Sequence, residues 1–147
     1  MLTALMLASA AKAGEAPTTF YVQLIRGTDT AQPPLPGCKP VGPRLAQTLS
    51  PVFRWKGYWE ISREHVALLP GQKSRVRLGY GREAEIDLSQ PAQRRVSAFH
   101  KGQLVDRTIS PVGDALTIIG GSRDAQSVWF IVVRRDKPHE ESVVRSP

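Results

Sequence analysis

A chain of 147 residues is long enough for one domain with its own hydrophobic core. Hydrophobic residues make up 41% of it and charged residues 22%, so the composition excludes wholesale disorder. The formal net charge of +7 favours anionic partners such as nucleic acid, acidic glycans or anionic lipid surfaces, and the single cysteine, Cys38, excludes an internal disulfide.

The N-terminus has the pattern of a signal peptide. Residues 2–11 form an apolar run rich in small residues, and Ala11-Lys12-Ala13 matches the small-x-small cleavage pattern, although no lysine or arginine precedes the run. We therefore predict a signal peptide over residues 1–13 and an extracytoplasmic location, periplasmic or secreted, in a bacterium. The alternative is an uncleaved N-terminal helix. No apolar run reaches the roughly 18 residues of a transmembrane helix.

The rest of the chain is predicted to form a linker over residues 14–18, a single β-rich domain over residues 19–138 and a disordered tail over residues 139–147. Residues 20–25 are almost continuously apolar, which predicts a strand covered on both faces. A proline-rich connector over residues 27–40 precedes a short helix that begins near Pro43 and ends at Ser50-Pro51.

Residues 53–61 form the densest aromatic stretch of the chain and are predicted to be a half-buried strand. Strand alternation divides it into an apolar face and a basic, hydrogen-bonding face. The apolar face has Phe53, Trp55, Trp59 and Ile61, and the other has Arg54, Lys56, Tyr58 and Glu60. Gly57, in the middle, predicts a bulge or a close approach of another backbone segment.

A hairpin is predicted where residues 73–78 and 82–88 flank the loop Gly79-Tyr80-Gly81. Antiparallel pairing across this loop places three cations opposite three carboxylates. The pairs are Arg77 with Glu83, Arg75 with Glu85 and Lys73 with Asp87, while Val76 meets Ala84 on the other face. We expect the charges on this hairpin to neutralise one another.

The last part of the chain predicts a second hairpin over residues 94–99 and 103–109, a strand over 115–119, a turn at 120–122 and an apolar strand over 128–133. The first and last apolar strands are expected to lie centrally and side by side. We predict a mainly β fold, an antiparallel two-sheet sandwich with one short helix after the first strand. The alternative is an α+β fold with that helix on one face of an antiparallel sheet.

The sequence offers little support for catalysis or for a cofactor. His65, His100 and His139 are far apart, and no metal-binding, nucleophile-elbow or phosphate-loop motif is present. The carboxylates of the first hairpin face cations, which should lower their pKa values and disfavour a proton donor. We expect no enzyme, no metal and no cofactor; a small hydrolase is the least favoured alternative.

Positive charge on the outer surface predicts binding of an anion. Arginine outnumbers lysine there, and its planar fork suits carboxylate and phosphate. The predicted binding residues are Arg54, Lys56, Tyr58, Arg63, Arg134 and Arg135, and Arg94, Arg95, Arg107 and Arg123 are also expected at the surface. The first hypothesis is a non-catalytic extracytoplasmic module that binds an anionic envelope component or a protein partner. The second is a cytoplasmic nucleic-acid-binding protein, which requires an uncleaved N-terminus.

Three stretches, residues 20–28 (FYVQLIRGT), 50–60 (SPVFRWKGYWE) and 129–136 (WFIVVRRD), together resemble a group of small exported bacterial proteins of unassigned function. The resemblance covers most of the predicted mature chain. It implies an envelope location and a compact, strand-rich domain, and it supplies no catalytic residue.

Overall fold

The computed structural model describes residues 16–123, 127–135 and 137–138. The predicted signal peptide and the tail over residues 139–147 lie outside the described residues. The elements are β1 (Thr18–Thr28), β2 (Lys39–Pro40), α1 (Pro43–Phe53), β3 (Gly57–Leu68), β4 (Lys73–Gly79), β5 (Arg82–Asp87), β6 (Gln93–His100), β7 (Gln103–Pro111), β8 (Leu116–Arg123) and β9 (Ser127–Arg134).

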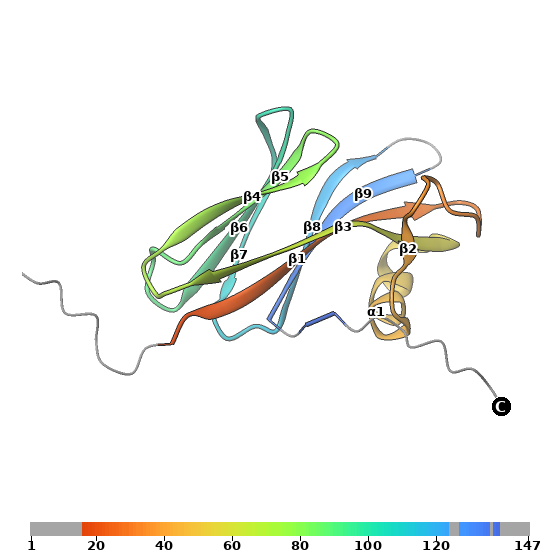
Figure 1. Ribbon diagram of the computed structural model, residues 1–147. Helices are drawn as coiled ribbons and strands as arrows, with labels where there is room; N and C mark the ends of the chain where they lie inside the picture. The colour runs from red at the N-terminus through yellow and green to blue at the C-terminus, as the bar shows by residue number, and fades with distance from the viewer. Residues whose placement is uncertain (1–15, 124–126, 136, 139–147) are drawn as a thin grey trace, which may run out of the picture.

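The strands form two antiparallel sheets that pack against each other (Figure 1). Sheet A has the strand order β2-β3-β1-β9-β8, and sheet B has the order β4-β5-β6-β7. This confirms the predicted sandwich. It also confirms that the first and last apolar strands pair, since β1 lies between β3 and β9.

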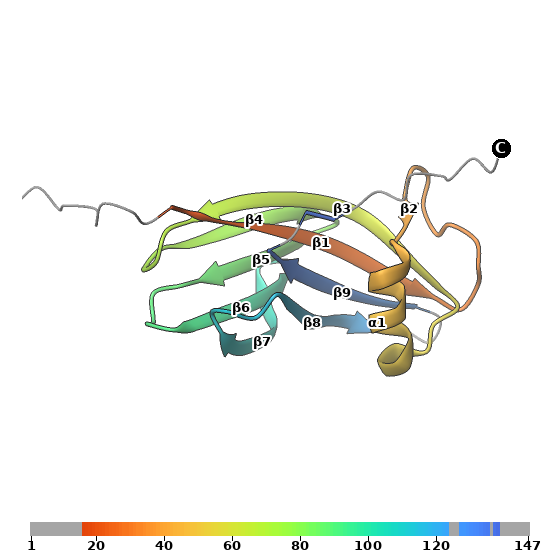
Figure 2. The same ribbon diagram turned by 90° about the horizontal axis from the view of Figure 1, so that it is seen from below.

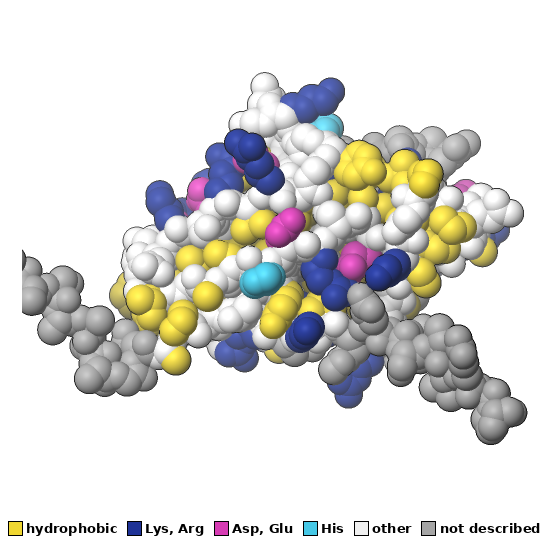
Figure 3. All heavy atoms as spheres, in the orientation of Figure 1, with side chains coloured by type: hydrophobic (Ala, Val, Ile, Leu, Met, Phe, Trp, Pro, Cys, Tyr) yellow, Lys and Arg dark blue, Asp and Glu magenta, His cyan; other side chains and the backbone are white. Residues whose placement is uncertain are grey.

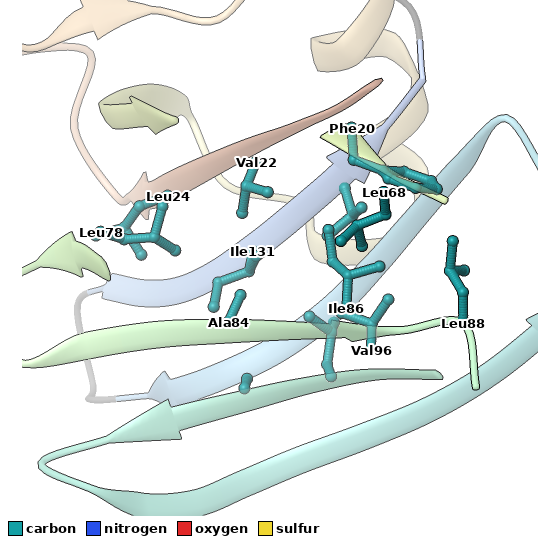
Figure 4. Packing of buried hydrophobic residues seen from close by; sticks show 13 residues of the cluster. Phe20, Val22, Leu24, Leu68, Leu78, Ala84, Ile86, Leu88, Val96 and Ile131 are labelled. Carbon is teal, nitrogen blue, oxygen red and sulfur yellow. The ribbon is translucent and has the colours of Figure 1, made fainter. Parts of the chain in front are cut away.

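The main core lies between the two sheets, where alternate residues of each strand point inward (Figure 4). Phe20, Val22 and Leu24 of β1 are fully buried against this layer, as are Ile86 of β5 and Val96 of β6. Strand alternation therefore decides which residues of each sheet form the core.

Helix α1 builds a second, smaller core on the outer face of sheet A (Figure 2). Leu45 and Leu49, four residues apart on one side of the helix, are buried there with Ile25, Phe130 and Val132. Because sheet B covers one face of β1 and β9 and α1 covers part of the other, most residues of these strands are buried. This explains why their sequences are almost continuously apolar.

The helix extends further than predicted. It runs through Pro51 to Phe53 and ends at Arg54, which has a left-handed backbone (φ 54°) and donates its N–H to the carbonyl of Ser50 at 3.1 Å. Proline in the last turn removes only one helical hydrogen bond, so the helix tolerates it there. The predicted strand over 53–61 is therefore wrong in its first half, and β3 begins at Gly57.

Two glycine predictions had different outcomes. A Cβ atom on Gly57 would lie 2.8 Å from the carbonyl oxygen of Thr30, which confirms the predicted close backbone approach. The predicted turn at residues 120–122 is wrong, because these residues belong to β8. The β8–β9 pairing is irregular between Gly120 and Arg123, so the glycines lie at a register shift, and the connection falls at residues 124–126, outside the described residues.

Hydrogen bonds between the sheets lie on both open sides of the sandwich. On one side the Ser62 hydroxyl of β3 donates to the Leu78 carbonyl of β4 at 2.5 Å. On the other, the Gly120 N–H of β8 donates to the Asp106 carboxylate of β7 at 3.2 Å. These bonds tie the two sheets together without closing a barrel.

Candidate functional site

The first three predicted binding residues do not share a face. Arg54 is the exposed C-cap of α1, and Lys56 is exposed in the connection before β3. Tyr58 is buried beneath α1, where its hydroxyl accepts the N–H of Trp55 at 3.0 Å and its ring lies edge-on to Phe130. The predicted outward position of Tyr58 is wrong because the helix covers that face of sheet A.

The other three predicted binding residues lie elsewhere. Arg63, on the outer face of β3, forms an ion pair with Glu60 at 3.0 Å. Arg134, at the end of β9, is the cross-strand partner of Tyr21 in β1. Arg135 follows and donates to the carbonyl of Gly113, in the β7–β8 connection, at 2.8 Å. The six predicted residues therefore do not form a single site.

The structure instead gathers two other arginines around one tryptophan. The guanidinium carbon of Arg82 lies 4.5 Å from the ring centroid of Trp129, and that of Arg26 lies 4.9 Å from the same centroid. The ring of Tyr80 lies 5.6 Å from the Trp129 ring, tilted by 40°. We call Arg26, Tyr80, Arg82 and Trp129 the arginine–aromatic cluster.

Strand alternation brings these residues together at one end of the core. Arg26 and Trp129 are cross-strand partners on β1 and β9, and each continues the inward-facing row of its strand. Arg82 continues the inward-facing row of β5 from the opposite sheet. The rows are Phe20, Val22, Leu24 and Arg26; Val133, Ile131 and Trp129; and Ile86, Ala84 and Arg82. The cluster is thus the polar end of the sandwich core.

The β4–β5 turn carries the fourth member of the cluster. Tyr80 has a left-handed backbone (φ 56°) between two glycines that are also left-handed, Gly79 and Gly81. This turn holds the tyrosine ring beside Trp129 while leaving 58% of the residue exposed. Figure 3 shows hydrophobic side chains gathered on the surface beside this turn.

Positive charge is concentrated at this end of the sandwich. Arg82 is buried, and this burial is the main reason why its pKa is lowered. The positive charge of Arg26 lowers the pKa of Arg82 further. The pKa of His100 is also lowered, by desolvation and by the charges of Arg82 and Lys101. Arg26 donates from Nη2 to the Ser127 hydroxyl at 3.2 Å, and its buried Nε has no hydrogen-bond partner among the described residues.

The cluster is chemically suited to hold an anionic group next to an apolar one. Guanidinium groups donate two parallel hydrogen bonds to carboxylate or phosphate, and aromatic rings contact apolar surface. Contact with Trp129 restrains both arginine side chains, so less side-chain entropy is lost when an anion binds. Within the described part of the chain, no group of three or more His, Cys, Asp or Glu residues is placed to hold a metal ion.

Glu83 and Asp87 of the first hairpin form ion pairs, in a pattern that matches the predicted one only in part. Arg77 pairs with Glu83 at 3.8 Å, as predicted. The backbone register is as predicted, with Arg75 opposite Glu85 and Lys73 opposite Asp87. The Arg75 guanidinium, however, pairs diagonally with Glu83 at 2.5 Å, and Arg95 of β6 pairs with Asp87 at 2.8 Å. The hydrogen bond from Arg95 and then those from Ser89 hold the pKa of Asp87 well below its usual range.

Sequence reasoning missed the cluster for identifiable reasons. Arg26 follows an apolar run, Trp129 lies in the predicted apolar strand over 128–133, and Arg82 lies in the predicted charged hairpin. Strand alternation would have identified them, because it places all three residues on inward-facing rows.

The prediction that Arg94 lies at the surface was also wrong. Arg94 is fully buried because it continues the inward-facing row of Val96 and Ala98.

Comparison with protein-family models, with curated proteins and with solved structures found no match to this chain. Of the described residues, no helix is long and apolar enough to cross a membrane. The geometry of the cluster and the charge of the chain therefore bear most directly on its function.

Proposed function

We propose that this chain is a non-catalytic binding module that acts outside the cytoplasm and holds an anionic component of the cell envelope. The observation that carries the proposal is the convergence of Arg26 and Arg82 on the ring of Trp129, each within 5 Å of its centroid. Three further features support the proposal: the exposed ring of Tyr80, the net charge of +7 and the signal-peptide pattern of residues 1–13.

The proposal favours binding over catalysis for a physical reason. The four residues that define the cluster carry cations and aromatic rings, which attract anions and apolar surface and are poor nucleophiles and general bases at neutral pH. A lowered pKa does not change this for Arg82, because arginine stays protonated in proteins. The cluster therefore has the chemistry of an anion receptor.

The test is binding of the purified mature protein to envelope fractions and to a polygalacturonate probe, with variants of the cluster. Arg26→Gln removes one cation, and Tyr80→Asn removes the exposed ring while suiting the left-handed backbone of the turn. Arg26→Gln should weaken binding by roughly ten-fold or more, since a charge-assisted hydrogen bond contributes about 1.5–3 kcal/mol. Tyr80→Asn should weaken binding by up to about ten-fold, since an aromatic contact contributes about 0.5–1.5 kcal/mol. Circular dichroism and thermal unfolding check that each variant folds.

Two controls make the outcome specific to the cluster. Arg77→Gln removes one charge from the same hairpin, at a side chain that is 92% exposed, and should leave binding almost unchanged. The paired change of Arg54 and Lys56 to Gln tests the surface predicted from the sequence. If that pair weakens binding and Arg26→Gln does not, the site has been assigned to the wrong part of the molecule.

A second candidate function is binding of single-stranded nucleic acid, which the neighbouring aromatic and arginine side chains of the cluster favour. Aromatic stacking on bases combined with cationic contact to phosphates is the usual mode of such proteins. The discriminating measurement is the affinity for an oligonucleotide as salt is raised, since contacts with several phosphates give a steep fall. Binding to envelope fractions combined with a flat salt response for the oligonucleotide would favour the first function.

A further inference from the structure

Strand β7 forms one edge of sheet B and presents a long unpaired side. It hydrogen-bonds to β6 along its whole length, and within the described chain no strand pairs with its other side. Residues 103–107 are exposed throughout. The backbone N–H and C=O groups on such an edge are arranged to pair with one more extended strand.

The side chains on the outer face of β7 alternate in character. Register with β6 places Leu104, Arg107 and Ile109 on the same face, opposite Phe99, Ser97 and Arg95. A register shift between Ala98 and Phe99 brings Leu104 onto the face of Arg107. Leu104 is 49% exposed and Ile109 is 58% exposed. The edge therefore presents an apolar, a cationic and an apolar side chain in order.

Arg107, the cation in this row, is held in one orientation and forms no ion pair with a described carboxylate. Nε of Arg107 donates to the Ser97 hydroxyl at 2.9 Å, which holds the side chain along the sheet. No ion pair joins Arg107 to an acidic side chain among the described residues; the neighbouring Asp106 accepts the backbone N–H groups of Arg107 and Gly120. A carboxylate from outside would meet an exposed, preoriented guanidinium.

The backbone of β7 is also held in place for pairing. The Asp106 side chain faces inward and accepts the Gly120 N–H of β8 at 3.2 Å, so the middle of the strand is fixed to the other sheet. A fixed edge loses little conformational freedom when a partner strand binds, which favours addition of a strand. Nothing in this arrangement requires the arginine–aromatic cluster.

We propose that β7 binds an extended segment of a partner protein, which adds to sheet B as a further strand. The segment carries an acidic residue opposite Arg107 and, two positions away on the same face, an apolar residue opposite Ile109. Backbone pairing supplies much of the affinity, and the carboxylate with its apolar neighbour supplies the specificity. Leu104 extends the apolar contact at the other end.

The test uses nine-residue synthetic peptides, the length of β7, with glutamate and isoleucine two positions apart. Binding to the full chain is followed by shifts of the backbone amide signals in NMR spectra. We expect shifts centred on β7 and a loss of affinity of roughly ten-fold or more when the peptide glutamate becomes lysine. N-methylation of alternate peptide backbone nitrogens should abolish binding, because it removes the donors that pair with the edge.

Variants of the protein complete the test. Arg107→Glu should reverse the preference, so that the lysine peptide binds more tightly than the glutamate peptide. Arg77→Glu, the same change at an exposed arginine of β4 on the other edge of sheet B, should leave the preference unchanged. Equal binding of the two peptides, binding after N-methylation, or no shift of β7 signals at millimolar peptide would overturn the proposal. Dimerisation through β7 without peptide, seen by sedimentation, would assign the edge to a second copy instead.

Discussion

Replacing Thr117 by Val tests how the fold accommodates a buried guanidinium. Arg94 is fully buried; its Nη1 donates to the carbonyl of Asp114 at 2.7 Å and its Nη2 donates to the hydroxyl of Thr117 at 2.6 Å. Burial lowers the pKa of Arg94, yet the side chain stays charged. Valine keeps the shape of threonine but cannot accept a hydrogen bond, so Nη2 loses its partner inside the core.

The size of the effect follows from the charge on the donor. A hydrogen bond that involves a charged group contributes about 1.5–3 kcal/mol to stability, and we expect Thr117→Val to lower the free energy of unfolding by that amount. For a domain of this size the loss corresponds to a fall in Tm of roughly 3–12 °C. Urea unfolding followed by tryptophan fluorescence measures it directly.

A double-mutant cycle separates this cause from loss of packing. Arg94→Met removes the cation while keeping an unbranched side chain in the core. In that background Thr117→Val removes a hydroxyl that no longer has a charged donor, so its cost should fall close to zero. A loss below about 0.5 kcal/mol for Thr117→Val alone, or the same loss in both backgrounds, would refute the reasoning.

Two further predictions concern stability. Gly57→Ala should lower the free energy of unfolding by about 1–3 kcal/mol because its Cβ would meet the Thr30 carbonyl at 2.8 Å, whereas Gly113→Ala, in open space, should be neutral; equal urea midpoints for the two would contradict this. Arg95→Met should cost about 1–3 kcal/mol at pH 7. Since Arg95 holds the pKa of Asp87 below its ordinary value of about 3.9, the stabilisation is present above that pH and is lost as pH falls further. The free energies of unfolding of the wild type and of Arg95→Met should therefore converge below about pH 4. A difference in free energy that stays constant with pH would contradict this prediction.

Local pattern was enough to predict much of the sheet structure. The hairpin of β4 and β5 has the predicted register, with Arg77 opposite Glu83 and Val76 opposite Ala84. A short loop between two alternating strands restricts the pairing to very few registers, so neighbouring residues decide it. The apolar runs of β1 and β9 were recognised as strands for a similar reason, because their composition requires cover on both faces.

The residues of the arginine–aromatic cluster could not be predicted in the same way. Exposure of a basic side chain was inferred from its type, yet Arg94 is buried, and Tyr58 lies under α1. Which face of a strand is covered depends on the element that packs there from a distant part of the chain. The error at Pro51 had the same consequence, since three more helical residues moved Arg54 off the strand.

The sequence by itself determined most of the strands and the register of the first hairpin, because these depend on side-chain alternation and on a short connection. It also indicated that β1 and β9 are central, because their continuous apolar runs require cover on both faces. Only the tertiary structure decided which arginines meet. Arg26, Arg82 and Trp129 lie on three strands from two sheets, and they converge because the inward rows of those strands end at the same edge of the core. That convergence depends on how the sheets stack, which no local stretch of residues encodes.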